Sequence, residues 1–247
     1  MITIENISKS FGKKEVLSDI SFTITEGNLV ALIGENGAGK TTLMRIMTGF
    51  LSASNGLVKI YNKNITKERI DALSYIGYVP EISALYGDML VYDFLKWIAN
   101  IWKIKDTDNA IITTAKQMDI TDVLNEKIEN LSKGYKKRVE IASAIIHSPK
   151  ILILDEPTDG LDPNQKKEIR LFMKNYSKKN IVLVSTHVLE DIECVDRVIM
   201  ISNGKLVKDA PIKEFKKTSQ KNSMSDAFSI LSNKQGCKKW ERSSYNF

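Results

Sequence analysis

Residues 34–42 read Gly34-Glu35-Asn36-Gly37-Ala38-Gly39-Lys40-Thr41-Thr42, a glycine-rich run that ends in a lysine and two threonines. An apolar run rich in strand formers, residues 29–33, comes directly before it, and apolar residues at helical spacing follow it as far as Gly49. The glycines therefore lie where a buried strand is expected to turn into a helix. In that context such a run wraps around phosphate groups.

The residue types of this run suit an anion. Glycines let the backbone approach phosphates closely, and the N–H groups of the turn and of the helix start point at the anion. Lys40 is placed to reach the terminal phosphates, and the Thr41 hydroxyl to ligate Mg²⁺. An ordinary glycine-rich turn would show the full motif by chance in roughly one chain in a hundred of this length. The run therefore predicts a nucleoside triphosphate ligand, with residues 34–42 as candidate contacts.

The composition indicates an intracellular globular protein. Of 247 residues, 43% are hydrophobic and 27% are charged, which is ordinary for a chain that buries a core. No apolar run approaches the roughly eighteen residues of a membrane-spanning helix, and the N-terminus lacks a signal-peptide pattern. Cys194 and Cys237 are isolated and without metal-ligand spacing, as is typical of a reducing compartment.

The net charge is +6, and much of it comes from pairs of neighbouring lysines. One interpretation is a solvated basic surface, and the other is attraction to the anionic inner face of a membrane. No nucleic-acid partner is expected, because no basic patch is interleaved with stacking aromatic residues.

The chain pattern predicts an α/β fold that a helical segment interrupts. Short strands are expected before residue 80, with Asn55-Gly56 as a hairpin-type turn; they lie at 2–7, 21–25, 29–33, 57–61 and 75–79. Residues 91–146 have a mostly helical pattern, and Ser132 is the expected N-cap of the last helix there. Strands and helices then alternate again, ending in a hairpin around Asn203-Gly204.

Two acidic residues, Asp155 and Glu156, follow the buried strand at 151–154. In an open α/β sheet ligands bind beyond the carboxyl ends of the strands, so these carboxylates are expected beside the phosphate-binding run. Asp155 suits Mg²⁺, directly or through water, and Glu156 suits positioning and deprotonating the attacking water. His187 follows another apolar strand at the same edge, where its imidazole can hydrogen-bond the γ-phosphate.

Together, these motifs resemble the ATP-binding subunit of an ATP-binding cassette (ABC) transporter over about residues 2–210. Residues 131–135, Leu-Ser-Lys-Gly-Tyr, occupy the place of that family's signature Leu-Ser-Gly-Gly-Gln. Residues 157–162 resemble the loop after its second nucleotide motif, and Thr186-His187 its switch histidine. Phe11 resembles the aromatic residue that stacks on adenine, although an unplaced phenylalanine can also pack in the core.

The resemblance implies a fold and a division of the chain. The fold is α/β, a P-loop NTPase core with an N-terminal antiparallel β subdomain and an inserted helical subdomain. Residues 1–210 are expected to form the ABC ATPase domain, with the helical insert at about 82–147. Residues 211–247 form a short C-terminal extension with one possible helix and a basic tail.

Members of this family work as dimers that hold each ATP between the phosphate-binding loop of one subunit and the signature of the other. By resemblance, Ser132, Lys133, Gly134 and Tyr135 serve the ATP bound to a partner subunit, and a helix start capped by serine suits that task. The resemblance implies ATP and Mg²⁺ as cofactors, a second ABC ATPase subunit in a homodimer, and a separate transmembrane permease subunit. It also implies a peripheral position on the cytoplasmic face of the cell membrane.

Three residues depart from the family pattern without removing a group that hydrolysis needs. Glu81 stands where the family usually has a glutamine that senses Mg²⁺ and the membrane subunit, and its carboxylate can still ligate the metal. Lys133 replaces a signature glycine and brings a cation near the γ-phosphate of the other subunit's ATP. Tyr135 replaces the signature glutamine and can stack on, or hydrogen-bond, the ribose. An active ATP hydrolase is expected, with three catalytic residues: Lys40, Glu156 and His187.

The variations favour the multidrug, antibiotic and peptide-export branch of the family. Two alternatives stay open: a soluble ABC ATPase acting on ribosomes, chromosomes or cluster assembly, and a nucleotide-binding regulatory or immunity module with little turnover. The chain is too short for the two cassettes of ribosomal members and lacks the long heptads of chromosomal members. The intact Glu156 argues against low turnover.

Four of the aromatic residues in the segment 81–102 have two interpretations: Tyr86, Tyr92, Phe94 and Trp97. Phe94 and Trp97 fall on an amphipathic helical stripe, which places them in the core of the insert. Alternatively, the segment forms a groove for a short cytoplasmic helix of the membrane subunit. Tyr86 and Tyr92 lie off the stripe, so they are the better groove candidates.

Overall fold

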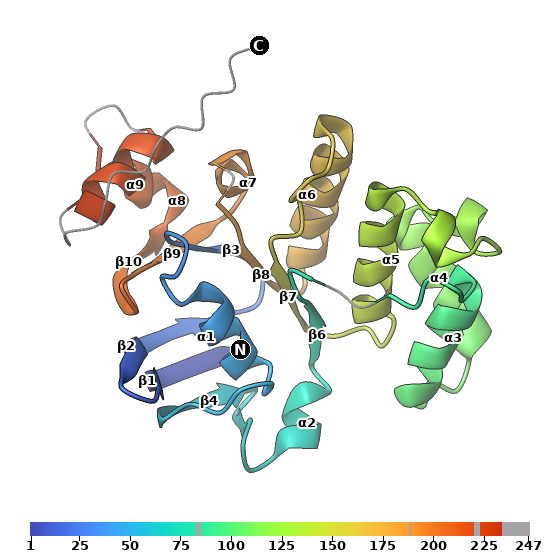
Figure 1. Ribbon diagram of the computed structural model, residues 1–247, viewed down its shortest axis with the longest axis horizontal. Coiled ribbons are helices and arrows are strands. Elements are labelled where there is room, and N and C mark those ends of the chain that lie inside the picture. Colours follow the sequence, from blue (N-terminus) through green and yellow to red (C-terminus); the bar gives the residue numbers. More distant parts are fainter. Residues whose placement is uncertain (83–84, 188, 220–222, 234–247) are drawn as a thin grey trace.

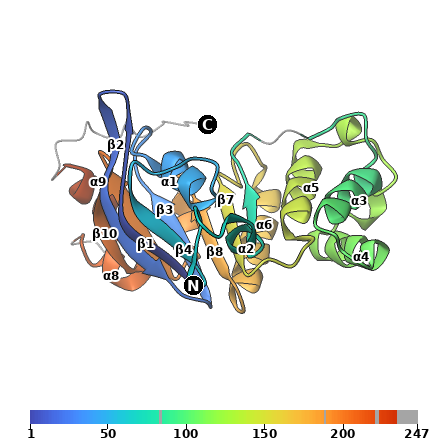
Figure 2. The same ribbon diagram turned by 90° about the horizontal axis from the view of Figure 1, so that it is seen from below.

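The structure, a computed structural model, describes four stretches of the chain: residues 1–82, 85–187, 189–219 and 223–233. Two β-sheets form the larger part of the molecule, and helices from the middle of the chain form a separate lobe at one end (Figures 1 and 2). The predicted α/β fold with an inserted helical part is confirmed. Within these stretches no helix is both long and apolar enough to span a bilayer.

The N-terminal sheet is antiparallel, with the strand order β2-β1-β4-β5. Its strands are β1 (Ile2–Phe11), β2 (Lys14–Ile24), β4 (Asn55–Ile60) and β5 (Lys63–Asn64). The prediction of a hairpin turn at Asn55-Gly56 is wrong, because these residues open β4 and Asn55 pairs with Ser8 of β1. The dipeptide favours a turn locally, but pairing across the sheet decides its conformation.

The second sheet has the strand order β10-β9-β3-β8-β7-β6. Its strands are β3 (Asn28–Ile33), β6 (Ile76–Val79), β7 (Ile151–Asp155), β8 (Ile181–Ser185), β9 (Arg197–Ser202) and β10 (Lys205–Pro211). Neighbours from β9 to β6 are parallel, and β10 pairs antiparallel with β9. The carboxyl ends of β3, β7 and β8 therefore lie at one edge, where Asp155 pairs with Ser185.

The second sheet is buried on both faces, as its almost continuous apolar runs predict. In β7, Ile151 and Ile153 belong to the core cluster shared with the N-terminal sheet and α1 (Lys40–Met47). Leu152 and Leu154 belong to the cluster on the opposite face. That face is covered by α6 (Pro163–Ser177) and α5 (Lys133–Ile145), so the sheet edge is held rigidly between two packed layers.

The helical lobe comprises α5 and the two helices before it, with two short 3₁₀ helices between them: α3 (Val91–Ile101), α4 (Thr107–Met118), η1 (Thr121–Val123) and η2 (Ile128–Asn130). The predicted N-cap of α5 is confirmed. The Ser132 hydroxyl accepts a hydrogen bond from the Tyr135 backbone N–H at 3.3 Å, and α5 begins at the next residue.

Helix α3 buries less of its apolar stripe than its spacing predicts. Phe94 is 4% exposed, whereas Trp97 and Ile101 are 41% and 57% exposed. The placement of Trp97 in the core is therefore wrong. Helical spacing puts these residues on one face, but it does not fix how much of that face the neighbouring helices cover.

Beyond β10 the described residues form two short helices, where the sequence indicated one. They are α8 (Ile212–Lys216) and α9 (Met224–Asn233), and α9 contacts α7 (Leu189–Glu193). Phe215 of α8 is fully buried in the core. The basic tail predicted from residue 234 onward lies outside the described residues. The remaining helix, α2 (Arg69–Leu73), precedes β6.

Candidate functional site

The glycine-rich run leaves β3 and enters α1, as the sequence predicts. Gly39 is the N-cap of α1 and has a φ of 105°, in the left-handed region that side chains rarely adopt. Gly34 lies so close to β9 that a Cβ atom there would be 2.2 Å from the carbonyl oxygen of Ile201. At these two positions the loop needs glycine in order to turn and to fit against the sheet.

Lys40 is the first residue of α1 and is 8% exposed. Its Nζ donates to the carbonyl oxygens of Gly34 and Glu35, at 2.8 and 3.3 Å. Burial lowers the pKa of the Lys40 ammonium, and nearby carboxylates, Glu156 first among them, oppose that shift. The loop therefore encloses a lysine that a phosphate group can reach from the open side.

A cleft of about 840 Å³ opens on this loop, within the usual size range of small-molecule sites. Its lining includes most of the predicted nucleotide, metal and catalytic residues: Asn36, Gly37, Gly39, Lys40, Thr41, Thr42, Glu81, Glu156 and His187. Gly34, Ala38 and Asp155 are buried behind this lining, and Glu35 is half-buried. The structure thus brings together residues that follow β3, β6, β7 and β8.

Glu156 and His187 form a pair at the carboxyl ends of β7 and β8. The Nδ1 atom of His187 lies 2.9 Å from Oε2 of Glu156, and the two side chains are 49% and 13% exposed. Glu156 has a φ of 49°, and its N–H donates to the carbonyl and hydroxyl oxygens of Ser185, both at 3.2 Å. Such a backbone conformation persists only where its surroundings hold it, and it is common at active sites.

Asp155 is held by the neighbouring strand. The Ser185 hydroxyl donates to Oδ1 of Asp155, whereas Oδ2 is buried and has no hydrogen-bond partner among the described residues. A buried carboxylate oxygen without a partner fits Mg²⁺ or a water bound to it. Mg²⁺ commonly binds through one or two carboxylates and takes further ligands from phosphates and water. Asp155, with Glu81 and Thr41 in the cleft lining, matches that ligand type.

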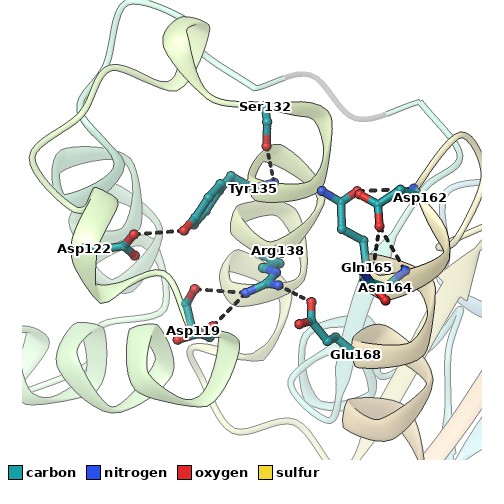
Figure 3. A network of polar contacts seen from close by, with 9 residues as sticks. All are labelled: Asp119, Asp122, Ser132, Tyr135, Arg138, Asp162, Asn164, Gln165 and Glu168. Carbon is teal, nitrogen blue, oxygen red and sulfur yellow. Dashed lines mark hydrogen bonds and ion pairs between the residues drawn. The ribbon is translucent and has the colours of Figure 1, made fainter.

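The signature residues, 132–135, begin α5 in the helical lobe and are not among the described residues that line their own chain's cleft. Tyr135 donates its hydroxyl to Oδ2 of Asp122 at 2.8 Å, a bond that raises the pKa of Tyr135. Arg138 bridges the end of α4 and Glu168 of α6 (Figure 3). These bonds fasten the signature helix both to its own lobe and to the core.

The signature also packs against the loop that follows Glu156. A Cβ atom on Gly134 would lie 2.2 Å from Nε2 of Gln165, and the Lys133 Nζ lies 1.7 Å from where a Cβ atom on Gly160 would stand. Gln165 belongs to the capping box that starts α6 (Figure 3). Within one chain, the signature and residues 157–162 are therefore direct neighbours.

Phe11 ends β1 and is 50% exposed, so its interpretation as a core residue is wrong. It pairs with Lys14 of β2, which lines the cleft. The Lys9 ammonium lies 5.0 Å from the centroid of the Phe11 ring, a favourable cation–π distance. An exposed ring thus lies next to the cleft, where a flat base can stack on it.

The helical lobe exposes an apolar patch of three residues, Tyr86, Trp97 and Ile101, here called the α3 patch. Tyr86 is 53% exposed and lies edge-on against Trp97, with ring centroids 5.3 Å apart. Tyr92, the other predicted groove residue, donates its hydroxyl to Asp108 at 2.6 Å and packs against the core. The structure therefore groups Tyr86 with Trp97 and leaves Tyr92 outside the patch.

Six residues of the cleft were not expected from the sequence: Lys14, Glu15, Val16, Asp159, Asn203 and Gly204. Gly204 lies in the predicted turn between β9 and β10, and its N–H donates to the Ala38 carbonyl at 3.2 Å. The sequence predicted the turn but not its place beside the phosphate-binding run, because no local sequence pattern shows that β9 lies beside β3. Asp159 did carry a signal, since it belongs to the loop that follows the acid pair.

Comparison with known proteins agrees with this geometry. A family model described as ABC transporter matches residues 17–159. The uncharacterized ABC transporter ATP-binding protein YhcH of Bacillus subtilis is 36% identical, over 87% of this chain and 71% of its own length. The bacitracin transport ATP-binding protein BcrA of Bacillus licheniformis is 32% identical, over 90% of this chain and 73% of its own. The lantibiotic transport ATP-binding protein SrtF of Streptococcus pyogenes is 32% identical, over 84% and 89%.

Solved structures show the same fold. One described as the ATP binding subunit of an ABC transporter has a TM-score of 0.85 at 24% identity, covering 94% of this chain and 99% of that one. CbiO1 from Clostridium perfringens, described as part of the ABC transporter complex cbiONQ, has a TM-score of 0.78 at 26% identity, covering 88% and 93%.

The fold and the site define a P-loop ATPase whose helical lobe is inserted between its two nucleotide motifs. The chain belongs to the ABC transporter family. It is an ATP-binding subunit that hydrolyses ATP and powers a separate membrane subunit.

Proposed function

We propose that this ATPase works as a homodimer on the cytoplasmic face of the cell membrane and powers the export of an antibiotic, drug or peptide. The cargo class is supported by the relatives named for bacitracin and lantibiotic transport, which match 90% and 84% of the chain. The sequence variations that favour the export branch point the same way.

One observation carries the proposed chemistry: a single cleft holds Lys40, Glu156 and His187. The amides of residues 34–42 and the Lys40 ammonium would bind the phosphates of ATP. Glu156 would orient a water molecule toward the γ-phosphate and take its proton. In its doubly protonated form, in which both ring nitrogens donate, His187 would hold the Glu156 carboxylate through Nδ1–H and the γ-phosphate through Nε2–H.

Three further residues would hold Mg²⁺, namely Thr41, Asp155 and Glu81. The metal would neutralise negative charge on the phosphates. The buried Oδ2 of Asp155 supports this assignment, because Ser185 already occupies the other carboxylate oxygen. Phe11 would stack on the adenine from the edge of the cleft, a role that its exposure and its pairing with Lys14 support.

The signature residues would serve ATP bound to the other subunit of the dimer. This is supported by their place at the start of α5, outside the cleft lining of their own chain. Ser132 and Gly134 would present helix N–H groups to the γ-phosphate. Tyr135 already donates its hydroxyl to Asp122, which favours stacking on the ribose. Lys133 would swing from Gly160 toward the γ-phosphate.

The α3 patch would receive a short cytoplasmic helix of the permease subunit. Exposed aromatic residues that bury against a partner are typical interface anchors. Tyr86 follows Glu81, a proposed metal ligand, by five residues in the chain. We also place the end of the ATPase domain at residue 210, with α8 and α9 as a short extension packed on it.

The test is steady-state phosphate release by the purified chain with ATP and Mg²⁺, alone and with its membrane subunit in liposomes. Release that stops when a chelator removes Mg²⁺, or when Lys40 is replaced by alanine, supports the proposal. For export, inside-out vesicles that contain both subunits should accumulate labelled bacitracin or a lantibiotic-type peptide when ATP is added. Binding of ATP without turnover, or cargo leaving preloaded inside-out vesicles, would contradict it.

A further inference from the structure

Asp191 of α7 is a fully buried carboxylate that ties three segments of the chain together. Its Oδ2 accepts hydrogen bonds from the hydroxyls of Thr158 and Thr186, the second at 3.0 Å. Its Oδ1 accepts from Nε of Arg170, on α6, at 2.6 Å. Asp191 and Thr186 are 0% exposed and Thr158 is 1% exposed, so solvent does not compete for these bonds.

The two threonines that bind Asp191 lie next to the proposed catalytic residues in the sequence. Thr158 comes two residues after Glu156, and Thr186 comes immediately before His187. Asp191 thus joins the loop that carries the proposed base to the loop that carries the proposed switch histidine. Both loops leave the same sheet edge, where Asp155 and Ser185 are the last pair of the β7–β8 ladder.

A fixed link is needed there because the contact between Glu156 and His187 is short and the backbone conformation of Glu156 is unusual. Nδ1 and Oε2 lie 2.9 Å apart, and a small shift of either loop would break that hydrogen bond. Glu156 also has a φ of 49°, a conformation that relaxes unless the residues around it are held. Ser185 holds the Glu156 N–H. Asp191 holds the chain two residues after Glu156, through Thr158, and immediately before His187, through Thr186.

The geometry points to Asp191 as a positioning residue for ATP hydrolysis: through Thr158 and Thr186 it sets the Glu156–His187 distance. This inference rests on the roles proposed for Glu156 and His187. It predicts that Asp191 controls the rate of the hydrolytic step and has little effect on ATP binding, because Lys40 and the loop amides lie on another segment.

A buried carboxylate paired with an arginine can also serve the fold alone, so the test must separate the two roles. Thr158→Val and Thr186→Val each remove one hydroxyl, keep the side-chain shape and leave the Arg170–Asp191 ion pair in place. Asp191→Asn keeps the size but loses one acceptor oxygen. Asp196→Asn is the matched control. Asp196 also binds α6, because Lys174 donates to it at 2.5 Å, and it accepts a hydrogen bond from the Leu29 N–H. Leu29 lies at the amino end of β3, whereas the cleft lies at the carboxyl ends of the strands.

The measurements are kcat and KM for phosphate release, ATP affinity and thermal unfolding. The threonine double variant and Asp191→Asn should lose about 10–100-fold in kcat, by analogy with the loss on removing a hydrogen-bond partner that orients a metal ligand, with ATP affinity unchanged. The double threonine variant should unfold at a lower temperature than wild type, because Oδ2 of Asp191 stays buried without its two hydroxyl donors, but it should still be folded at the assay temperature. Asp196→Asn should keep its kcat. In a His187→Ala background the threonine substitutions should change the single-turnover rate less than twofold, since the pair they position is already gone.

Wild-type kcat in the double threonine variant, or an equal fold loss with and without His187, would overturn the inference. Glu156→Gln separates this failure from failure of the proposed site. If Glu156→Gln is inactive while the threonine and Asp191 variants turn over normally, only the positioning role fails. If Glu156→Gln itself hydrolyses ATP normally, the proposed roles of Glu156 and His187 fail as well.

Discussion

His187 and Glu156 meet through a 2.9 Å contact between Nδ1 and Oε2, although they follow two different strands of the central sheet. The imidazole is about half exposed to the cleft and the carboxylate is mostly buried behind it. The pair therefore presents one face to a bound phosphate and keeps the other against the sheet. This relationship is the basis of the proposed hydrolytic step.

The composite site predicts complementation between two inactive variants. Ser132→Arg should abolish hydrolysis but still bind ATP, because Lys40 and the loop amides of the same chain are intact. Lys40→Ala should lose binding itself, since each charge-assisted hydrogen bond to phosphate contributes about 1.5–3 kcal/mol. A mixed dimer retains one site built from an intact Lys40 and an intact Ser132, so phosphate release should reappear on mixing.

Each variant alone, at the same total concentration, is the control for this experiment. A mixture as inactive as its parts would count against a site shared between two subunits. Recovery that rises with the fraction of mixed dimers would support the shared site.

The α3 patch predicts a variant that separates ATP hydrolysis from its coupling to the membrane. Tyr86→Ala removes an exposed ring that touches Trp97, so the isolated subunit should stay folded and hydrolyse ATP normally. Stimulation by the membrane subunit, and transport, should both fall. Leu171→Ala is a suitable control, because Leu171 is 62% exposed on α6. Equal stimulation of wild type and Tyr86→Ala in liposomes would remove Tyr86 from the coupling surface.

Much of the fold could be predicted from the sequence because its signals are local. The apolar run before Gly34 forms β3, and the run after Lys40, which has helical spacing, forms α1. The phosphate-binding loop connects the two. Predictions failed where distant parts of the chain decide the structure. Asn55-Gly56 pairs with β1 across a sheet, and Trp97 faces outward because the neighbouring helices leave that part of α3 uncovered.

The candidate site was likewise predicted where the signals are local and missed where distant parts of the chain come together. Asp155, Glu156 and His187 were predicted to share an edge because parallel strands place their carboxyl ends together. Gly204 was missed as a cleft residue, since the order β10-β9-β3 is not the order of the sequence. Asp191 gave no signal at all. A single aspartate in a short helix looks like a surface residue until the fold buries it.

His147 provides a test of the buried core at the base of the lobe. Its Nε2 donates to the Ile76 carbonyl at 3.1 Å, and its ring stacks on Trp102 with centroids 3.8 Å apart. Burial lowers the pKa of His147 to about 4. The unfolded chain, with a pKa near 6.5, binds this proton more readily, so the stabilising contribution is complete above pH 6.5 and is lost as the pH falls toward 4.

The expected loss is roughly 2.5 kcal/mol at pH 4.5, from 1.36 kcal/mol per unit of pKa difference. Urea unfolding of wild type and of His147→Gln at pH 7 and pH 4.5 measures it. Carboxylates titrate in both proteins, so the difference in the free energy of unfolding between wild type and His147→Gln isolates the contribution of His147. A gap between them that does not change with pH would mean that His147 keeps an ordinary pKa in the folded protein.

Glu156→Gln tests the proposed hydrolytic mechanism most directly. The amide cannot take a proton from water, so the rate of phosphate release should fall about 10²–10⁴-fold while MgATP still binds. Unhydrolysed ATP should then hold two subunits together, and the variant should elute as a dimer in gel filtration with ATP. Glu214→Gln, on the exposed surface of α8, should behave as wild type. Near wild-type hydrolysis by Glu156→Gln, without a dimer, would contradict the proposed mechanism.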